Sequence, residues 1–372
     1  MYDVLTTPAN IHPKILELIP DLGRDESKSY WRRVLRIAAL CHDLGHLPFS
    51  HAAEKDLLPH GWDHERITVD IIRSKEMQEI WDAMIPPLRS EHIVKIAVGP
   101  KKLTQEKFSD WEAILSEIIV GDAFGVDRMD YLLRDSHHAG VAYGKFDHYR
   151  LIDTLRILPR EEHGSLEPSL GVEEGGVHSA EALLLARYFM YMQLYLHPVR
   201  RVYDIHLKDF LKEWLKEGKF GTSVDKHLEM TDNEVTSAIL KAARNSGLKG
   251  HDPARRIVNR EHFRMLYQRN PNDVAKNPEA GKAIFEAACD KFGSDLVRYD
   301  AYKPKGTGID FGVLARDERI ISSLALSDTL KNLPVPAIEF VFVSPVYRKE
   351  AHHWLEESRD AIIEIKGEDI NE

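Results

Sequence analysis

Three histidines and an aspartate lie close together in the run HDLGHLPFSH, which begins at His42 and follows an apolar segment. Residues four apart share one face of a helix, so a helix through this run would place His42 and His46 side by side. Asp43 would lie next to that face, one residue further along the helix. Imidazole and carboxylate together suit a divalent cation, whose open positions can hold water or a phosphate oxygen. The run therefore predicts a hydrolytic metal site that needs further ligands from elsewhere in the fold. The alternative is a solvated helix end that is rich in histidine.

A second polar group lies in the run VDRMDYLLRDSHH at 126–138. On a helix, one face would carry an acid, a phenol, a base and an imidazole, because residues at steps of three or four recur there: Asp127, Tyr131, Arg134 or Asp135, and His138. Such a face is unusual for a core-facing stripe and favours a site. The alternative is an exposed, salt-bridged face of an ordinary helix.

A histidine and a glutamate stand next to each other in WDHE at 62–65, between the two runs. Asp63 is a credible N-cap for a helix over 66–72. At the start of that helix, His64 and Glu65 could orient or protonate a group bound in a cleft. They could equally be ordinary polar residues of a first helical turn.

Together these runs resemble the HD-domain metal-dependent phosphohydrolases, and most closely their deoxynucleoside triphosphate triphosphohydrolase branch. The resemblance rests on CHDLGHLPFSH at 41–51, WDHE at 62–65 and GVDRMDYLLRDSHHAG at 125–140. It implies a mainly α fold built on an HD-domain helical bundle. It also implies a divalent metal ion as cofactor (Mn, Fe, Mg or Zn) and a nucleotide as the small-molecule substrate.

The resemblance further implies a role for each matching residue. The implied metal ligands are His42, Asp43 and Asp127. The implied catalytic residues are His64 as general acid, Glu65 as the carboxylate that orients it, and His46 as a phosphate-contacting or catalytic histidine. The implied substrate-binding residues are His51 against the phosphates, Tyr131 and Asp135 at the sugar, and the basic residues Lys145, Arg150 and Arg200, which could help to neutralise a triphosphate.

The chain departs from the family pattern at its amino end. Relatives have a further metal-ligating histidine well upstream of the His-Asp pair, in a stretch like Arg-Phe-x-His-Ser. Here His12 is the only upstream histidine, and we do not expect it to be the ligand because the following Pro13 disfavours helix at that residue. We therefore expect the chain to start inside the domain, so that it binds metal weakly or is inactive.

Composition is that of an ordinary globular enzyme, with 372 residues, 43% apolar and 30% charged. The formal charge of −10 argues against extended nucleic-acid binding, which needs a net basic face. Two cysteines are too few for a disulfide framework, and no stretch has the length and apolarity of a membrane span or signal peptide. We expect a cytoplasmic protein without a membrane partner and, by the resemblance, a homo-oligomer.

The pattern divides the chain into an HD helical domain at 1–216 and a smaller C-terminal α+β accessory domain at 217–372, joined at a glycine-containing segment. In the first domain, periodicity predicts helices over 30–44, 64–73, 76–84, 90–97, 111–120, 126–138, 146–156 and 180–215, the last interrupted at Pro198. A loop or hairpin is expected over 157–177, with strand at most over 169–172. In the second domain, helices are expected over 232–245, 277–292 and 349–365, and strands over 296–302, 309–314, 320–325 and 337–343.

These features predict a phosphohydrolase that splits a deoxynucleoside triphosphate into nucleoside and triphosphate. His64 would give a proton to the leaving sugar oxygen, because expulsion of an alkoxide without protonation is costly. Two alternatives stay open. One is a nucleoside monophosphate or cyclic nucleotide phosphohydrolase with the same metal centre, and the other is a catalytically impaired regulatory protein that binds nucleotide without turnover.

Overall fold

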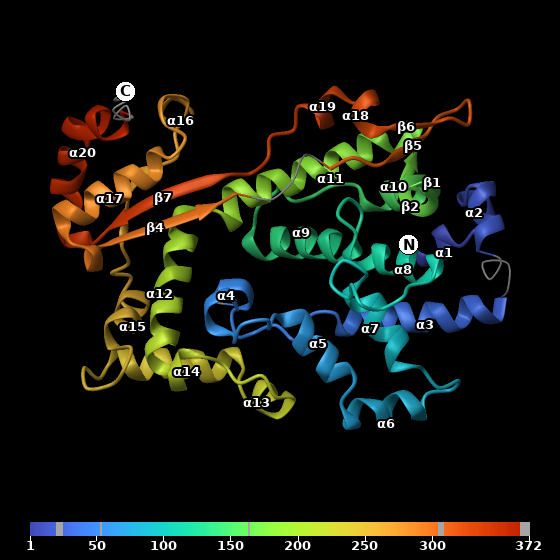
Figure 1. The fold of residues 1–372 in the computed structure, drawn as a ribbon, viewed down its shortest axis with the longest axis horizontal. Helices are drawn as coiled ribbons and strands as arrows, with labels where there is room; N and C mark the ends of the chain where they lie inside the picture. The colour runs from blue at the N-terminus through green and yellow to red at the C-terminus, as the bar shows by residue number, and fades with distance from the viewer. Residues whose placement is uncertain (20–24, 53, 163, 304–308, 365–372) are drawn as a thin grey trace, which may run out of the picture.

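The computed structural model describes residues 1–19, 25–52, 54–162, 164–303 and 309–364. It confirms a mainly α fold with a smaller α+β part towards the C-terminus (Figure 1). The helices of the first part are α1 (Tyr2–Leu5), α2 (Pro13–Leu18), α3 (Asp25–Cys41), α4 (Glu54–Leu57), α5 (His64–Ile72), α6 (Lys75–Ala83), α7 (Ser90–Val98), α8 (Asp110–Val120), α9 (Val126–Ala139), α10 (His148–Thr154) and α11 (Val177–Met190).

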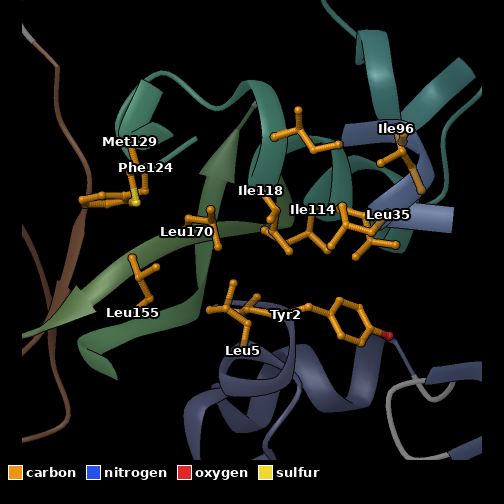
Figure 2. Close-up of a cluster of buried hydrophobic side chains, with 14 of the residues drawn as sticks. Tyr2, Leu5, Leu35, Ile96, Ile114, Ile118, Phe124, Met129, Leu155 and Leu170 are labelled. Carbon is orange, nitrogen blue, oxygen red and sulfur yellow. The ribbon is translucent and has the colours of Figure 1, made fainter. Parts of the chain in front are cut away.

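The main core lies where α3, α7, α8 and α9 meet the β-hairpin (Figure 2). Helix α8 is central to it because Ile114 and Ile118, four residues apart, point from one face into the cluster. A capping box fixes the start of α8: Ser109 accepts the Glu112 N–H, and the Glu112 carboxylate accepts the Ser109 N–H. The core therefore sets the position of α9, the helix that carries Asp127.

The hairpin is longer than the sequence pattern indicated. Strands β1 (Leu155–Glu162) and β2 (Ser165–Glu173) pair antiparallel, so the predicted helix over 146–156 is wrong beyond Thr154. Leu155 and Ile157 are completely buried in the main core, and that packing outweighs the local helical pattern. Two short strands from much later in the chain, β5 (Gly312–Leu314) and β6 (Ile320–Ser322), complete a sheet of order β1-β2-β5-β6.

A proline separates the two long helices that follow the hairpin. Helix α11 runs into a π-helical turn at Tyr191–Tyr195, and α12 (Pro198–Trp214) begins at Pro198 with His197 as its N-cap. Figure 1 shows α12 between the HD helices on one side and the C-terminal strands on the other. Helices α13 (Val224–Leu228), α14 (Asp232–Ala243) and α15 (His251–Val258) follow it.

The C-terminal α+β part is a three-stranded antiparallel sheet of order β3-β7-β4 with helices packed on it. Its strands are β3 (Arg264–Gln268), β4 (Val297–Tyr302) and β7 (Ile338–Val343), and its helices are α16 (Pro271–Lys276), α17 (Ala280–Phe292) and α20 (Arg348–Ile363). The short helices α18 (Ser323–Leu326) and α19 (Asp328–Lys331) instead follow β6 and pack beside α11 on the main core. The helix expected over 349–365 thus ends at Ile363, and residue 365 lies outside the described residues. Within the described part of the chain, no helix has the length and apolarity to cross a membrane.

Candidate metal centre and active site

The HD motif lies in a turn and not on a helix. Helix α3 ends at Cys41, so the helix expected over 30–44 is wrong for its last three residues. The His46 N–H donates to the Asp43 carbonyl and closes the turn. Asp43 then lies between the two histidines, with Oδ2 3.3 Å from His42 Nε2 and Oδ1 3.3 Å from His46 Nε2. The turn therefore brings together the side chains that a helix was expected to align.

Gly45 lets this turn pack directly against the first residues of α5. Its N–H donates to Thr68 Oγ1 at 2.9 Å, and a Cβ at this position would lie 2.0 Å from the His64 carbonyl oxygen. No side chain fits that space. The close approach places the His46 ring on the His64 ring, nearly parallel at a centroid distance of 4.1 Å.

A methyl group at Gly45 should separate the turn from α5. We expect Gly45→Ala to lower the free energy of unfolding by about 1–3 kcal/mol, as overpacking does, and to lower activity because the two imidazoles move apart. Gly247→Ala is the matched control, since a Cβ there meets nothing nearer than 3.3 Å. Thermal melts of both variants measure the effect, and equal melting temperatures would contradict it.

Asp127 reaches the HD turn from the first turn of α9. Its Oδ1 lies 3.3 Å from His42 Nε2, so this buried nitrogen is 3.3 Å from two carboxylate oxygens and makes no hydrogen bond of good geometry. Ligand atoms about 2.1 Å from one cation lie about 3.0–3.4 Å apart at octahedral or tetrahedral angles. His42, Asp43 and Asp127 thus fit a shared divalent cation.

The other ring nitrogen of His42 is fixed by the backbone. Nδ1–H donates to the Ala39 carbonyl at 2.8 Å, which leaves Nε2 as the coordinating atom. Burial lowers the pKa of His42, but the carboxylates of Asp127 and Asp43 outweigh it and the pKa is raised. A proton therefore competes with a cation for Nε2.

His64 is the first residue of α5, and two carboxylates hold it. Asp63 caps the helix as expected, accepting the Arg66 N–H at 2.9 Å. Glu54 Oε1 lies 2.8 Å from His64 Nδ1 and 2.9 Å from the His64 N, and Glu65 Oε2 lies 3.3 Å from Nδ1. Burial lowers the pKa of His64, yet the bond to Glu54 and the nearby negative charges raise it overall.

Glu54 is a site residue that sequence reasoning missed. It lies in the short helix α4, ten residues before His64, where no helical or strand periodicity links the two. Glu65 has a second partner, because Lys102 Nζ lies 2.8 Å from Glu65 Oε1. Of the two carboxylates, Glu54 lies nearer to His64 Nδ1, at 2.8 Å against 3.3 Å for Glu65.

Tyr131 and Asp135 of α9 meet the π-helical turn after α11. The Tyr195 hydroxyl donates to Asp135 Oδ2 at 2.8 Å, and the Tyr131 and Tyr195 rings pack edge to face at 6.0 Å. Burial raises the pKa of Tyr131 and of Tyr195, so both phenols are protonated at neutral pH. Tyr195 was not predicted from the sequence, since only the fold brings it to a residue 60 positions away.

The remaining predicted residues are less closely associated with this cluster. His51 lies in the 3₁₀ turn Ser50–Ala52, and its side chain is outside what the structure describes. Arg200 donates to the carbonyl of Tyr195 and pairs with Asp204. Lys145 is exposed in the loop before α10, and Arg150 reaches the Gly175 carbonyl. Among the described contacts, neither Lys145 nor Arg150 touches the ligand cluster.

Two family models match this chain, the HD domain over residues 17–132 and the HD associated region over residues 146–289. A solved hypothetical protein from Aquifex aeolicus is 31% identical, with a TM-score of 0.70 over 91% of this chain and 82% of its own. The chain belongs to the HD-domain phosphohydrolase family. A phosphohydrolase from Bacteroides thetaiotaomicron shares the fold at 19% identity, with a TM-score of 0.57, covering 84% of this chain and 79% of that one.

The curated relatives of this HD-domain protein are longer than the regions they share with it. The uncharacterized protein YwfO of Bacillus subtilis is 34% identical over 76% of this chain and 66% of its own length. Human deoxynucleoside triphosphate triphosphohydrolase SAMHD1 is 27% identical over 63% of this chain and 41% of its own length. The chain thus spans about two fifths of the human protein's length.

Proposed function

We propose that this HD-domain protein is a metal-dependent phosphohydrolase that converts a deoxynucleoside triphosphate to deoxynucleoside and triphosphate. The observation that carries the proposal is the convergence of His42, Asp43 and Asp127 beside the stacked imidazoles of His46 and His64. A ligand triad and a carboxylate-held histidine are the parts that phosphate-ester hydrolysis needs. The names of the SAMHD1 relatives favour the deoxynucleotide substrate.

In the proposed reaction, a divalent cation held by the triad would polarise a phosphate oxygen and lower the pKa of bound water. A water oxygen adds to the α-phosphorus while the bond from that phosphorus to the 5′ oxygen breaks, and His64 acts as general acid that protonates the departing 5′ oxygen. Because Glu54 holds Nδ1, the proton that His64 gives is the one on Nε2. Stacking on His46 keeps the ring in place for that transfer.

The tyrosines next to Asp135 would bind the sugar. The Tyr131 and Tyr195 rings supply a largely apolar wall, and the Asp135 carboxylate can accept a hydrogen bond from a sugar hydroxyl. Tyr195 restrains Asp135 through its hydroxyl, so the acceptor is preorganised. This arrangement suits a nucleotide better than an inorganic polyphosphate.

The pH dependence of turnover should follow the His64–Glu54 pair. His64 must be protonated to act, and its pKa is raised, so kcat should fall as pH rises through a value above the usual range of histidine. In Glu54→Gln the negative charge beside His64 is lost, and burial then lowers the pKa of His64. The alkaline limb of the kcat–pH profile should therefore move to lower pH. A kcat–pH profile of each protein measures this, with Glu106→Gln, which loses only its ion pair to Arg73, as control. An unmoved limb in Glu54→Gln would contradict it.

Product analysis tests the proposed function. The protein is supplied in turn with Mn²⁺, Fe²⁺, Mg²⁺ or Zn²⁺ and with each deoxynucleotide, and products are separated by ion-exchange chromatography. Intact triphosphate with free nucleoside is the expected outcome. Inorganic phosphate from a nucleoside monophosphate, or a nucleoside monophosphate from a cyclic nucleotide, would assign the other hydrolase chemistry. Nucleotide binding without products would make the chain a binding protein.

A further inference from the structure

Two neighbouring residues of the loop after the HD turn have left-handed backbone conformations. Phe49 has φ of 60° and Ser50 has φ of 55°. Residues other than glycine seldom adopt this region, and they remain in it only when surrounding structure holds them there. The pair lies between His46 and Glu54, two of the side chains around His64.

Residues from far along the chain contact both the HD turn and this loop. Asp232, the first residue of α14, accepts the Phe49 N–H at 2.8 Å. His227 of α13 donates from Nε2 to the carbonyl of Leu44 at 2.8 Å, and Leu44 directly follows Asp43 in the chain. Each contact joins residues 183 positions apart.

Further contacts reach α4, the short helix that follows this loop. Lys208 Nζ pairs with Asp56 Oδ2 at 2.8 Å, and Phe220 N–H donates to the Leu57 carbonyl at 2.9 Å. Leu57 is completely buried in a cluster that also contains Val235 of α14. Residues from α12 to α14 thus contact the chain from the HD turn to α4.

We propose that α13 and α14 hold the active-site loop in its working conformation, with His227 and Asp232 as positioning residues. Asp232 stabilises the left-handed pair by accepting the Phe49 N–H, and His227 fixes the carbonyl next to Asp43. Through this loop they set the distance between the metal ligands and the Glu54–His64 pair. The inference rests on the proposed function for its effect on turnover, but not for its effect on the loop.

Hydrogen exchange of the metal-free protein tests the effect on the loop without any substrate. Asp232→Ala should speed exchange in peptides that cover 44–58 and leave peptides of the main core unchanged. Asp232→Asn retains an oxygen that can accept the Phe49 N–H and should exchange like the parent protein. Asp225→Ala removes a first-turn acid from α13 and is the matched control. Unchanged exchange in Asp232→Ala, or equal acceleration in Asp232→Asn, would overturn the proposal.

Turnover of the deoxynucleotide that the parent protein uses gives a second readout. Loss of one positioning hydrogen bond should lower kcat about five- to tenfold in Asp232→Ala, with KM near the parent value. Asp232→Asn should restore kcat to near the parent value. Likewise, His227→Gln, whose amide can donate a hydrogen bond to the Leu44 carbonyl, should have a higher kcat than His227→Leu. If the substitutions acted only by lowering stability, the melting temperature would fall, and kcat would not depend on whether residue 232 can accept a hydrogen bond or residue 227 can donate one. If the parent protein turns over no nucleotide, the proposed function fails while the exchange experiment still decides the role of α14.

Discussion

Asp127→Ala should lose at least about 1,000-fold in kcat/KM and most of its bound metal. Asp127 supplies one of two carboxylate oxygens that lie 3.3 Å from the buried His42 Nε2. Without it, the cation keeps only two of the three ligands that the described residues provide. The stabilisation that a cation gives to a phosphoryl oxygen is several kcal/mol, and about 4 kcal/mol corresponds to that factor.

The control for this variant is on the same helix. Asp130 is exposed in α9 and makes an i,i+4 ion pair with Arg134, a pairing that contributes a few tenths of a kcal/mol. Asp130→Ala should therefore keep activity within about twofold of the parent. Metal content measured by mass spectrometry, together with kcat/KM, distinguishes the two variants. If Asp127→Ala retains both stoichiometric metal and turnover, then the three residues do not share a cation.

His64→Ala should lower kcat by about 100- to 10,000-fold while metal content stays that of the parent protein. Removal of a general acid forces the 5′ oxygen to leave without a proton. His64 also belongs to a group with Asp43 and His46 whose ligand atoms lie close enough to hold a cation. Metal content therefore separates the two roles, because loss of metal along with activity would make His64 a ligand.

A thio-substituted substrate sharpens this test. In a deoxynucleotide with sulfur in place of the bridging 5′ oxygen, the thiolate leaves without protonation, so His64→Ala should lose far less activity than with the oxygen substrate. His60→Ala is the matched control, because His60 is exposed four residues before His64. An equal loss with both substrates would exclude proton transfer from His64 to the leaving group.

Residue types and their order along the chain were enough to predict the family and much of the local structure. The runs at 42–51 and 125–140 carry the HD resemblance, and the family models now confirm it. Asp63 caps α5 and Gly140 ends α9 in the left-handed conformation, as their residue types predict. The roles assigned to the individual site residues stay predictions, to be tested by the variants above.

Other features depended on contacts that no local pattern encodes. Periodicity extended α3 through the HD turn, whereas packing of Gly45 against the His64 carbonyl favours a turn. Periodicity likewise predicted that a helix continues into the residues of β1, whereas burial of Leu155 and Ile157 favours a strand there. In both cases tertiary packing outweighed a weak local preference.

The sequence by itself determined which side chains are available for metal binding and proton transfer, because those properties belong to residue types. Only the tertiary structure decided which of them meet. Asp127 reaches His42 and Tyr195 reaches Asp135 because the core fixes α9 beside the HD turn and the π-helical turn. Contacts between residues far apart in sequence depend on how whole elements pack, and a local pattern reports only on its near neighbours.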